Sequence, residues 1–339
     1  MLFQEQRHEV LLGELRRHGA VRVSELAREL GVSELTIRRD IAALAARNLV
    51  HRVHGGATLP RRARVVGRPP GFTIGMVVPS LDFYWPPIVA GARAAAAALG
   101  VTVQLRGSSY DPDEDRRQIG RLIDAGQVQG LLLAPSLTGD EMLDWIGRLP
   151  VPVVLVERQP PRWHPPAKQA EWVRTDHVLG LEMAVHHLHE HGHRKFGLVL
   201  ATGSPTSAHL RQGWRAAGLP EPIDLDDRAI RDVPAASRRA GLTALIVHSD
   251  PQAIAVAQVY AEEGLRIPED LALISYDDEV AHLAEPALTA IRPPKNHVGR
   301  LAVELMVSRL VDGDRRPARG VLVAPELVVR QSSPFHVRV

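Results

Sequence analysis

Residues 21–40 read VRVSELARELGVSELTIRRD, and this stretch decides the character of the N-terminal part of the chain. Ser24 is placed to cap a first helix, and Gly31 is placed to end it because glycine tolerates positive φ angles. Ser33 is placed to cap a second helix. The apolar faces of the two helices are made of Leu26, Ala27 and Leu30, and of Ile37, Ile41 and Leu44. The stretch predicts two short helices joined by a tight turn.

The second predicted helix carries polar and basic residues away from its apolar face. Arg39 is expected to point away from that face, and Thr36 and Arg38 lie towards its flanks. Such a helix suits the major groove of DNA, where an arginine binds guanine through two hydrogen bonds. The candidate DNA contacts of this segment are Ser33, Thr36, Arg38 and Arg39.

A β-prone segment, LVHRVH at residues 49–54, follows this helix, and two glycines at 55–56 allow a tight turn. This is the composition of a wing, in which Arg52 and His54 are placed to meet phosphate or the minor groove. An isolated arginine is an ordinary surface charge, but the order of the whole set favours DNA contact. From about residue 7 to residue 57 the chain resembles the DeoR-type winged helix-turn-helix. The resemblance implies a DNA-binding domain over residues 1–59.

The charges of the 339-residue chain are unevenly divided. Residues 1–70 hold 13 arginines and no lysine against 7 acidic residues, a net charge of +6. The remainder holds 28 basic and 32 acidic residues, a net charge of −4. A basic head on a mildly acidic body favours DNA contact through the head. There is no cysteine, no apolar run of membrane-spanning length and no signal peptide, so the sequence predicts a cytoplasmic protein without disulfides.

A linker is predicted at residues 60–71, PRRARVVGRPPG, because this segment has no apolar periodicity and is rich in proline, glycine and arginine. Its consecutive prolines favour an extended conformation. We expect its arginines to be solvated, with contact to the DNA backbone as the second interpretation.

Short apolar runs alternate with helical stretches over residues 72–339 and predict an α/β fold. Strands are expected at 74–78, 101–105, 130–134 and 153–156, and again at 196–200, 244–247 and 271–275. Helical segments separate them, for example 88–99 and 114–125. Continuous apolar strands that alternate with helices imply parallel sheets covered on both faces. Two such sets imply two α/β subdomains.

Parallel sheets of this kind bind ligands beyond the carboxyl ends of their strands. The residues expected there combine aromatic rings with carboxylate, hydroxyl and guanidinium groups, and they are Asp82, Phe83, Tyr84, Trp85, Glu157, Arg158, Ser249, Asp250 and Asp277. Charged groups bind hydroxyls through paired hydrogen bonds, and flat rings cover the C–H faces of a sugar. The pattern favours a neutral, polyhydroxylated ligand.

Residues 72–333 are similar to the effector-binding domain of the LacI/GalR repressors, itself similar to periplasmic sugar-binding proteins. The segments that carry the likeness include VRTD at 173–176, RQGW at 211–214, SYDD at 275–278 and PALTAI at 286–291. The resemblance implies that the ligand contacts Asp277, Arg158, Arg211, and Asp250 or its neighbour Ser249. It also implies that an aromatic side chain among residues 83–85 stacks on the ligand.

The chain departs from that family at several places. Leu210 stands where the family usually has an arginine, three residues before the Gly-aromatic pair, and Arg211 comes one residue later. Ser249 stands where asparagine commonly precedes the aspartate, and residues 219–242 are shorter than usual. The family's own DNA head and hinge helix are replaced by the DeoR-type head, whose own family usually carries a sugar-phosphate-sensing body. The sequence is therefore a mosaic of two families.

A cluster of histidines, His186, His187, His189, His191 and His193, has the spacing from which a helix can build a metal site. We expect no metal, because no thiolate accompanies the cluster and histidine at the end of a helix complements the helix dipole. The chain has no GxSxG, Walker-type or GxGxxG motif. The sequence therefore predicts neither a catalytic site nor a cofactor.

Together these features predict a sugar-responsive, DNA-binding transcriptional regulator. We expect a homodimeric repressor whose affinity for operator DNA changes when a neutral sugar binds between the two subdomains. Two alternatives stay open: a constitutive DNA-binding protein whose body is a ligand-free dimerisation module, and a sugar-processing enzyme tethered to DNA. A phosphorylated ligand is less expected, because the candidate residues include several carboxylates against few cations.

Overall fold

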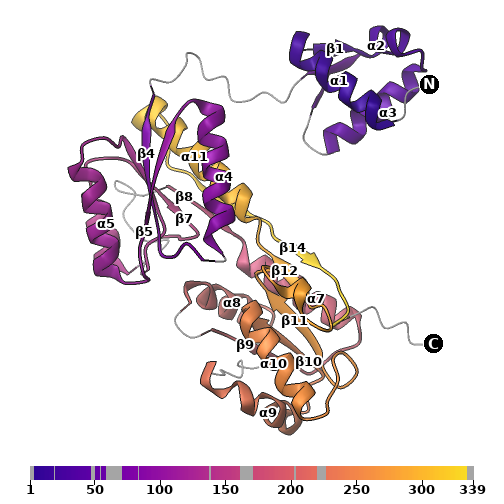
Figure 1. Cartoon of the computed structure of the whole chain (residues 1–339), viewed down its shortest axis with the longest axis vertical. Helices are drawn as coiled ribbons and strands as arrows, with labels where there is room; N and C mark the ends of the chain where they lie inside the picture. Colours follow the sequence, from indigo (N-terminus) through magenta and orange to yellow (C-terminus); the bar gives the residue numbers. More distant parts are fainter. Residues whose placement is uncertain are drawn as a thin grey trace. The chain divides into compact units, whose positions relative to one another are not determined.

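The structure is a computed structural model of the chain, and it describes residues 4–18, 20–46, 50–53, 55–58, 71–82, 84–136, 139–160, 171–201, 204–219 and 227–333. The chain forms two compact units, Met1–Pro69 and Pro70–Val339, which we call the head and the body (Figure 1). The linker predicted at 60–71 lies outside the described residues apart from Gly71. Its bounds, and those of the domains beside it, stay a prediction.

The head packs its helices and a small antiparallel sheet around one core. The helices are α1 (Gln4–His18), α2 (Val23–Leu30) and α3 (Glu34–Ala46). The strands β1 (Ala20–Arg22), β2 (His51–Val53) and β3 (Gly56–Thr58) pair in the order β1-β3-β2. The apolar faces predicted for α2 and α3 pack in this core with Leu11 and Leu15 of α1. The predicted helix-turn-helix domain is confirmed.

The capping predictions for α2 and α3 have different outcomes. Gly31 follows α2 with a φ of +64°, as predicted, and Ser33 caps α3 by accepting the Thr36 N–H at 3.2 Å. The prediction that Ser24 caps α2 is wrong, since the helix already begins at Val23. The Val23 N–H donates to the carbonyl oxygen of Gly55 at 2.9 Å, so the sheet side of the head satisfies the start of this helix.

A buried carboxylate connects α3 to α1. The carboxylate of Asp40 accepts hydrogen bonds from Nε of Arg7 at 2.8 Å and lies 3.2 Å from Nε2 of His8. A buried charge persists only when it is paired in this way. These contacts hold the second helix of the helix-turn-helix at a defined position against α1.

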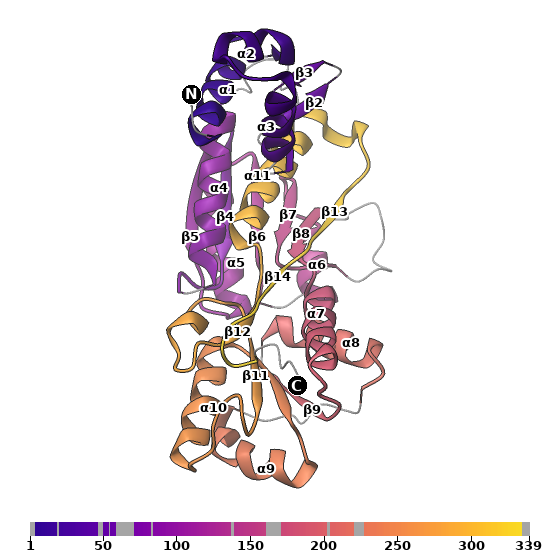
Figure 2. The ribbon, with the colours of Figure 1, turned by 90° about the vertical axis from the view of Figure 1, so that its right-hand side faces the viewer.

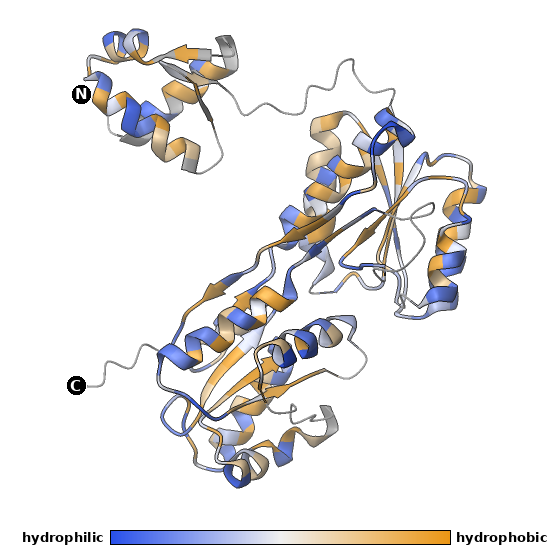
Figure 3. Ribbon diagram, turned by 180° about the vertical axis from the view of Figure 1, so that it is seen from behind, coloured by the Kyte–Doolittle hydropathy of each residue, from blue (hydrophilic) through white to orange (hydrophobic). Residues whose placement is uncertain are grey.

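The first lobe of the body is built on a six-stranded sheet of order β13-β8-β7-β6-β4-β5, whose pairs are all parallel. Its strands are β4 (Thr73–Val78), β5 (Thr102–Gly107), β6 (Gly130–Leu133), β7 (Val153–Val156), β8 (Glu171–Thr175) and β13 (Gly320–Val323). Helices α4 (Trp85–Leu99) and α11 (Lys295–Asp312) cover one face. Helices α5 (Pro112–Asp124) and α6 (Asp140–Ile146) cover the other, so the central strands are apolar on both sides (Figure 3).

The second lobe is built on a five-stranded sheet of order β14-β12-β11-β10-β9, with only the edge strand β14 antiparallel. Its strands are β9 (Phe196–Val199), β10 (Ala244–His248), β11 (Ala272–Tyr276), β12 (Thr289–Arg292) and β14 (Glu326–Val328). Helices α7 (His177–Glu190) and α8 (Pro205–Ala216) cover one face, and α9 (Val233–Ala240) and α10 (Asp250–Glu262) cover the other. Short 3₁₀ turns occur at Asp227–Asp232, Ala281–Leu283 and Gly313–Arg315. The predicted α/β fold class with two parallel-sheet subdomains is confirmed.

The chain passes between the two lobes at several points. Strand β8 of the first sheet leads to α7 of the second lobe, β12 leads back to α11, and β13 leads to β14. Figure 2 shows the extended connection from β13 to β14 running from one lobe to the other. Residues near 176, 294 and 324 therefore lie at the junction of the lobes. Within the described ranges, no helix has the length and apolar character needed to cross a membrane.

Candidate functional site

Helix α3 of the head presents its basic residues to solvent. The side chains of Arg38 and Arg39 are exposed, and Nη2 of Arg38 donates to Glu34 at 2.9 Å. Ser33 and Thr36 are joined by a hydroxyl contact of 2.9 Å at the start of the helix. Among the described residues Arg39 has no ion-pair partner, so its guanidinium is available to an external acceptor. The side chain of Arg52 and the whole of His54 lie outside the described residues.

In the body, several buried polar atoms at the carboxyl ends of strands have no hydrogen-bond partner among the described residues. They are the hydroxyls of Tyr84 after β4, Ser108 after β5 and Ser136 after β6, Nδ1 of His248 at the end of β10, and Oδ1 of Asp277 after β11. Strands β6, β4 and β5 are neighbours in one sheet, and β10 and β11 are neighbours in the other. An unpaired buried polar atom costs free energy, so this concentration indicates groups kept for a ligand.

The backbone is strained in loops at the carboxyl ends of strands in both sheets. Non-glycine residues with positive φ include Tyr110 (58°), Glu157 (53°), Asp277 (102°) and Asp278 (49°). Each follows a strand, and a left-handed conformation at such residues costs on the order of 1–3 kcal/mol. Strain of this kind persists where the surrounding structure holds functional groups in place.

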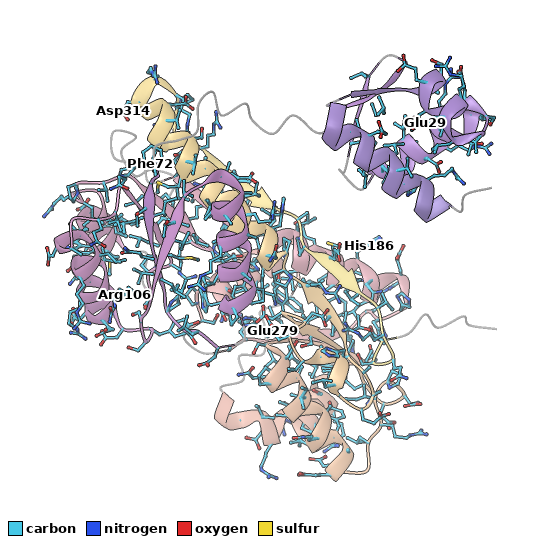
Figure 4. All side chains as sticks on the ribbon, turned by 45° about the horizontal axis from the view of Figure 1, so that its top comes forward. Glu29, Phe72, Arg106, His186, Glu279 and Asp314 are labelled. Carbon is cyan, nitrogen blue, oxygen red and sulfur yellow. The ribbon has the colours of Figure 1, made fainter. Side chains whose placement is uncertain are left out.

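Lys295 connects the two lobes at the unpaired atoms. Its ammonium donates to the carbonyl oxygen of Asp277 at 2.5 Å and pairs with Glu279, which Figure 4 labels where the lobes meet. The same nitrogen lies 5.1 Å from the ring centre of Tyr84, a cation–π contact. Because Lys295 begins α11, the first lobe's helix contacts both the Tyr84 loop of its own lobe and the Asp277 loop of the other.

A chain of hydrogen bonds also crosses the junction through His177. Its Nε2 lies 3.5 Å from Oε2 of Glu157, and its Nδ1 lies 3.1 Å from the hydroxyl of Tyr276. Glu157 accepts two further hydrogen bonds, from the N–H of Thr175 at 3.0 Å and from its hydroxyl at 2.8 Å. With the proton on Nε2, His177 donates to Glu157 and accepts from Tyr276, which links the ends of β7 and β11.

We call Tyr84, Glu157, His177, His248, Asp277 and Lys295 the junction site. Burial raises the pKa of Asp277 to about 7, and the charges of Asp250, Glu279 and Glu157 add to the effect, whereas Lys295 opposes it. Burial lowers the pKa of His248 to about 3, so its imidazole beside Asp277 is neutral. Burial alone would raise the pKa of Glu157, but hydrogen bonds from His177 and Thr175 outweigh it and hold the pKa below its ordinary value. Apart from the ammonium of Lys295, which pairs with Glu279, the site thus presents neutral and anionic hydrogen-bonding groups.

Of the body residues predicted from the sequence, Tyr84, Glu157 and Asp277 lie in the junction site. Arg158 is buried beside it and donates to the carbonyl oxygens of Pro135 at 2.6 Å and Glu157 at 2.8 Å. Arg211 is half-buried on α8. Their contacts to a ligand stay predictions.

Trp85 and Asp82, which belong to the same loop as Tyr84, have contacts outside the junction site. Trp85 is buried in the core of the first lobe, and its Nε1 donates to the hydroxyl of Tyr110 at 3.2 Å. Asp82 is exposed and accepts a hydrogen bond from Ser80 at 3.2 Å. Phe83 lies outside the described residues. Of the described aromatic residues of this loop, Tyr84 is the one that lies in the junction site, and its contact to a ligand stays a prediction.

Ser249 and Asp250 both make hydrogen bonds within the second lobe. Ser249 is the N-cap of α10, and its hydroxyl donates to Oε1 of Gln252 at 2.6 Å. Asp250 is fully buried, and its Oδ2 accepts the backbone N–H groups of residues 279–281. Their contacts to a ligand stay predictions.

Sequence reasoning missed His177, His248, Lys295, Tyr110 and His209. His248 closes β10 and His177 follows β8, so a fuller list of residues at strand ends would have included both. Lys295 and His209 lie on helices, and no local pattern places them near the strand ends. Tyr110 directly precedes the start of α5, where the carboxylate of Asp111 accepts the N–H of Asp113 at 2.9 Å, and no local pattern distinguishes it.

The histidine cluster lies on α7 and on the turn that follows it, and His187 is the member that is buried. Residues 189–193 read HEHGH, which matches the HExxH pattern, but the pattern needs both histidines on one helix. Helix α7 ends at Glu190, and Gly192 has a φ of +84°. Nε2 of His187 lies 3.0 Å from the carbonyl oxygen of Ser333. Among the described residues, no group of three or more histidine or acidic side chains is arranged to hold a metal ion.

Two family descriptions match the chain. Residues 7–63 match a DeoR-like helix-turn-helix domain, and residues 185–333 match a periplasmic binding protein-like domain. The first match covers the head. The second covers most of the second lobe and α11 of the first.

The chain is also similar to known repressors. It is 26% identical over 279 residues to the ribose operon repressor of Escherichia coli strain K12, which covers 77% of this chain and 82% of that protein. It is 26% identical over 342 residues to the transcriptional repressor CytR of the same strain, which covers 93% of this chain and 96% of that protein. The relative PurR of Photobacterium profundum is 26% identical over 276 residues, covering 77% of this chain and 80% of its own length.

Solved structures of LacI-type regulators share the fold. A regulatory protein of the LacI family from Chloroflexus aggregans superposes with a TM-score of 0.66 at 24% identity and covers 78% of this chain and 99% of its own. A complex of the transcriptional regulator CelR with cellobiose superposes with a TM-score of 0.63 at 25% identity, covering 88% of this chain and 90% of its own.

Proposed function

We propose that this chain, which joins a DeoR-like helix-turn-helix domain to the periplasmic-binding-protein-like body of LacI-family repressors, is a transcriptional repressor controlled by a small uncharged sugar. The head binds operator DNA, and the sugar binds at the junction site. Because the junction site takes residues from both lobes, a ligand there favours one arrangement of the lobes over another, and the affinity for DNA changes with it.

One observation carries this proposal: a DNA-reading head and a set of unpaired buried polar atoms at the strand ends of both sheets occur in the same chain. Hydroxyls, a neutral imidazole and a carboxylate are suited to a polyhydroxylated ligand, which both donates and accepts hydrogen bonds. The printed names of relatives and neighbours, which include a ribose operon repressor and a cellobiose complex, support the same class. The protein then acts in the cytoplasm as a homodimer and as a regulator rather than an enzyme.

Arg39→Ala is expected to weaken operator binding by about 10- to 100-fold, because one bidentate arginine–guanine contact contributes about 1–3 kcal/mol. The measurement is fluorescence anisotropy of the full chain with a duplex selected by the parent protein from a random library. Arg93→Ala is the matched control, since Arg93 is an exposed arginine of α4 in the body. An Arg39→Ala variant that binds as tightly as the control would remove Arg39 from the DNA interface.

Asp277→Asn is expected to abolish stabilisation by sugar and to make the unliganded protein more stable above neutral pH. The pKa of Asp277 is about 7 in the folded protein against an ordinary value of 3.8. Between these two pH values the carboxyl group of the native state holds a proton that the carboxyl group of the unfolded state has lost. The contribution of Asp277 to the free energy of unfolding therefore falls as the pH rises from about 4 to about 7, by at most about 4 kcal/mol. Asparagine stays neutral and avoids that loss.

The test compares the free energies of unfolding of the Asp277→Asn variant and the parent from pH 4 to pH 8. The comparison with the parent is needed because His248 has the opposite pH dependence. Its pKa is lowered to about 3, so the stability that it contributes is lost as the pH drops below about 6.5. The difference between the two proteins should grow up to about pH 7 and then stay constant. A constant difference over the whole range would show that Asp277 does not titrate near neutrality.

A further inference from the structure

Helix α3 carries an exposed leucine in its first turn. The other large apolar side chains of α2 and α3 pack in the core of the head or against it, whereas Leu35 is 57% exposed. Among the described residues of the head, the one other exposed large apolar side chain is Val53, on strand β2 of the predicted wing. The exposed apolar groups of the head thus lie on the helix and the wing, the two elements that a winged helix-turn-helix brings to DNA.

Leu35 lies on the same helix face as Arg39. Residues four apart in a helix project from one face, with their Cβ atoms about 5–6 Å apart. Both side chains are exposed, and Ala42, three residues beyond Arg39, continues the face with a small, half-buried side chain. This face thus presents an apolar group beside a cation, and the alanine leaves room for another surface to approach the helix.

The charges around Leu35 favour DNA as the partner of this face. The carboxylate of Glu34 pairs with Arg38 at 2.9 Å, so the acidic residue next to Leu35 is neutralised on its own helix. The centres of protein–protein interfaces are depleted of charged residues, whereas the major groove places the C5-methyl group of thymine among base edges that bind arginine. An exposed leucine beside arginines therefore fits a thymine methyl group better than it fits an apolar protein surface.

We propose that Leu35 contacts the C5-methyl group of a thymine in the major groove of the operator and so helps to set the operator sequence. The inference rests on the proposed function, since it concerns how the head reads DNA. Leu35 and Arg39 are one helical turn apart, and successive base pairs are about 3.4 Å apart. The thymine is therefore expected about one or two base pairs from the guanine that Arg39 contacts.

The experiment measures the affinity of the full chain for the duplex that the parent selects from a random library, by fluorescence anisotropy at fixed salt. Each thymine is replaced in turn by deoxyuridine, which differs only in lacking the C5-methyl group. The parent is compared with Leu35→Ala, and with Leu322→Ala as a control, because Leu322 is a leucine of β13 in the body that is 47% exposed. Thermal midpoints without DNA show that each variant is folded.

We expect deoxyuridine at one thymine position to weaken binding by the parent and by the Leu322→Ala control about fourfold, through the loss of one buried methyl group. Leu35→Ala should bind the thymine duplex about tenfold more weakly than the parent does. It should bind the deoxyuridine duplex as well as the thymine duplex, because alanine is too short to reach the methyl group from the same helix position.

A second pair of duplexes tests the same methyl group on another base. The T·A pair at that position is exchanged for C·G, with either cytosine or 5-methylcytosine, which returns a methyl group to the same place in the groove. The parent should bind the 5-methylcytosine duplex more tightly than the cytosine duplex, and Leu35→Ala should bind both equally. A merely structural role of Leu35 would not produce this difference.

The outcomes separate this inference from the proposed function. If the parent binds its selected duplex and no deoxyuridine weakens binding by more than about twofold, the inference is wrong and DNA binding by the head stands. If deoxyuridine weakens binding by Leu35→Ala as much as binding by the parent, another residue contacts the methyl group and the inference is wrong. If the parent selects no sequence from the library, the DNA-binding part of the proposed function fails, and the inference fails with it.

Discussion

Asp250→Ala is expected to lower the free energy of unfolding by about 3–5 kcal/mol, because it removes a fully buried carboxylate and leaves its donors without a partner. Oδ2 of Asp250 accepts the backbone N–H groups of Glu279 at 2.6 Å, Val280 at 2.8 Å and Ala281 at 3.1 Å, and Oδ1 accepts the hydroxyl of Ser275. The carboxylate therefore holds the loop after β11, which carries Asp277. Chemical denaturation of the full chain measures the effect on the body.

Two further variants sharpen this test. Asp250→Asn keeps the size of the side chain but replaces one acceptor oxygen by an NH₂ donor, so it should destabilise nearly as much as alanine. Glu262→Ala is the control, since Glu262 ends the same helix and makes an exposed ion pair with Arg231, worth less than about 1 kcal/mol. If Asp250→Ala costs no more than this control, Asp250 is not the anchor of the loop.

Gly299→Ala is expected to destabilise the first lobe by about 3 kcal/mol, since the added methyl group has no room. A Cβ atom at Gly299 of α11 would lie 1.9 Å from the carbonyl oxygen of Ile88 in α4. From the other helix, a Cβ at Gly91 would lie 1.9 Å from the carbonyl oxygen of Asn296. Backbone atoms cannot turn aside as a side chain does, so α4 and α11 must separate.

Gly120→Ala provides a control with the opposite sign. Gly120 lies inside α5, and a Cβ there would meet no atom within 4 Å. Alanine should stabilise this helix by about 0.5–1 kcal/mol, because glycine loses more backbone entropy on folding. Denaturant midpoints of the two variants measure the contrast. Equal stabilities would mean that α4 and α11 are not packed backbone to backbone.

The sheet core was predictable because its strands are short, continuous apolar runs. The runs predicted at 153–156 and 196–200 correspond to β7 (Val153–Val156) and β9 (Phe196–Val199) almost residue for residue. Strands β8, β12, β13 and β14 were not predicted as strands. Strands β8, β12 and β14 are three to five residues long and include polar residues, as in EWVRT or TAIR, and β13 is a run of only four residues, GVLV. Such short segments become strands only by pairing with a neighbour.

The junction site was predictable where it depends on a strand end and unpredictable where it depends on the crossings between lobes. Tyr84 and Asp277 follow β4 and β11, so a topological rule places them. Asp250 also follows a strand, but backbone amides from residues 279–281 capture it, and only the folded chain shows that contact. Lys295 and His209 reach the site because α11 and α8 return to it from distant parts of the sequence.

Ligand binding in the body is expected to change DNA binding by the head. The deciding measurement is the affinity of the full chain for its selected operator duplex, at fixed salt, with and without a sugar that raises the thermal midpoint. We predict that a saturating concentration of this sugar changes the affinity by about fivefold or more, and that Asp277→Asn removes the change. An operator affinity that stays the same while the sugar is bound would show that the body does not control the head.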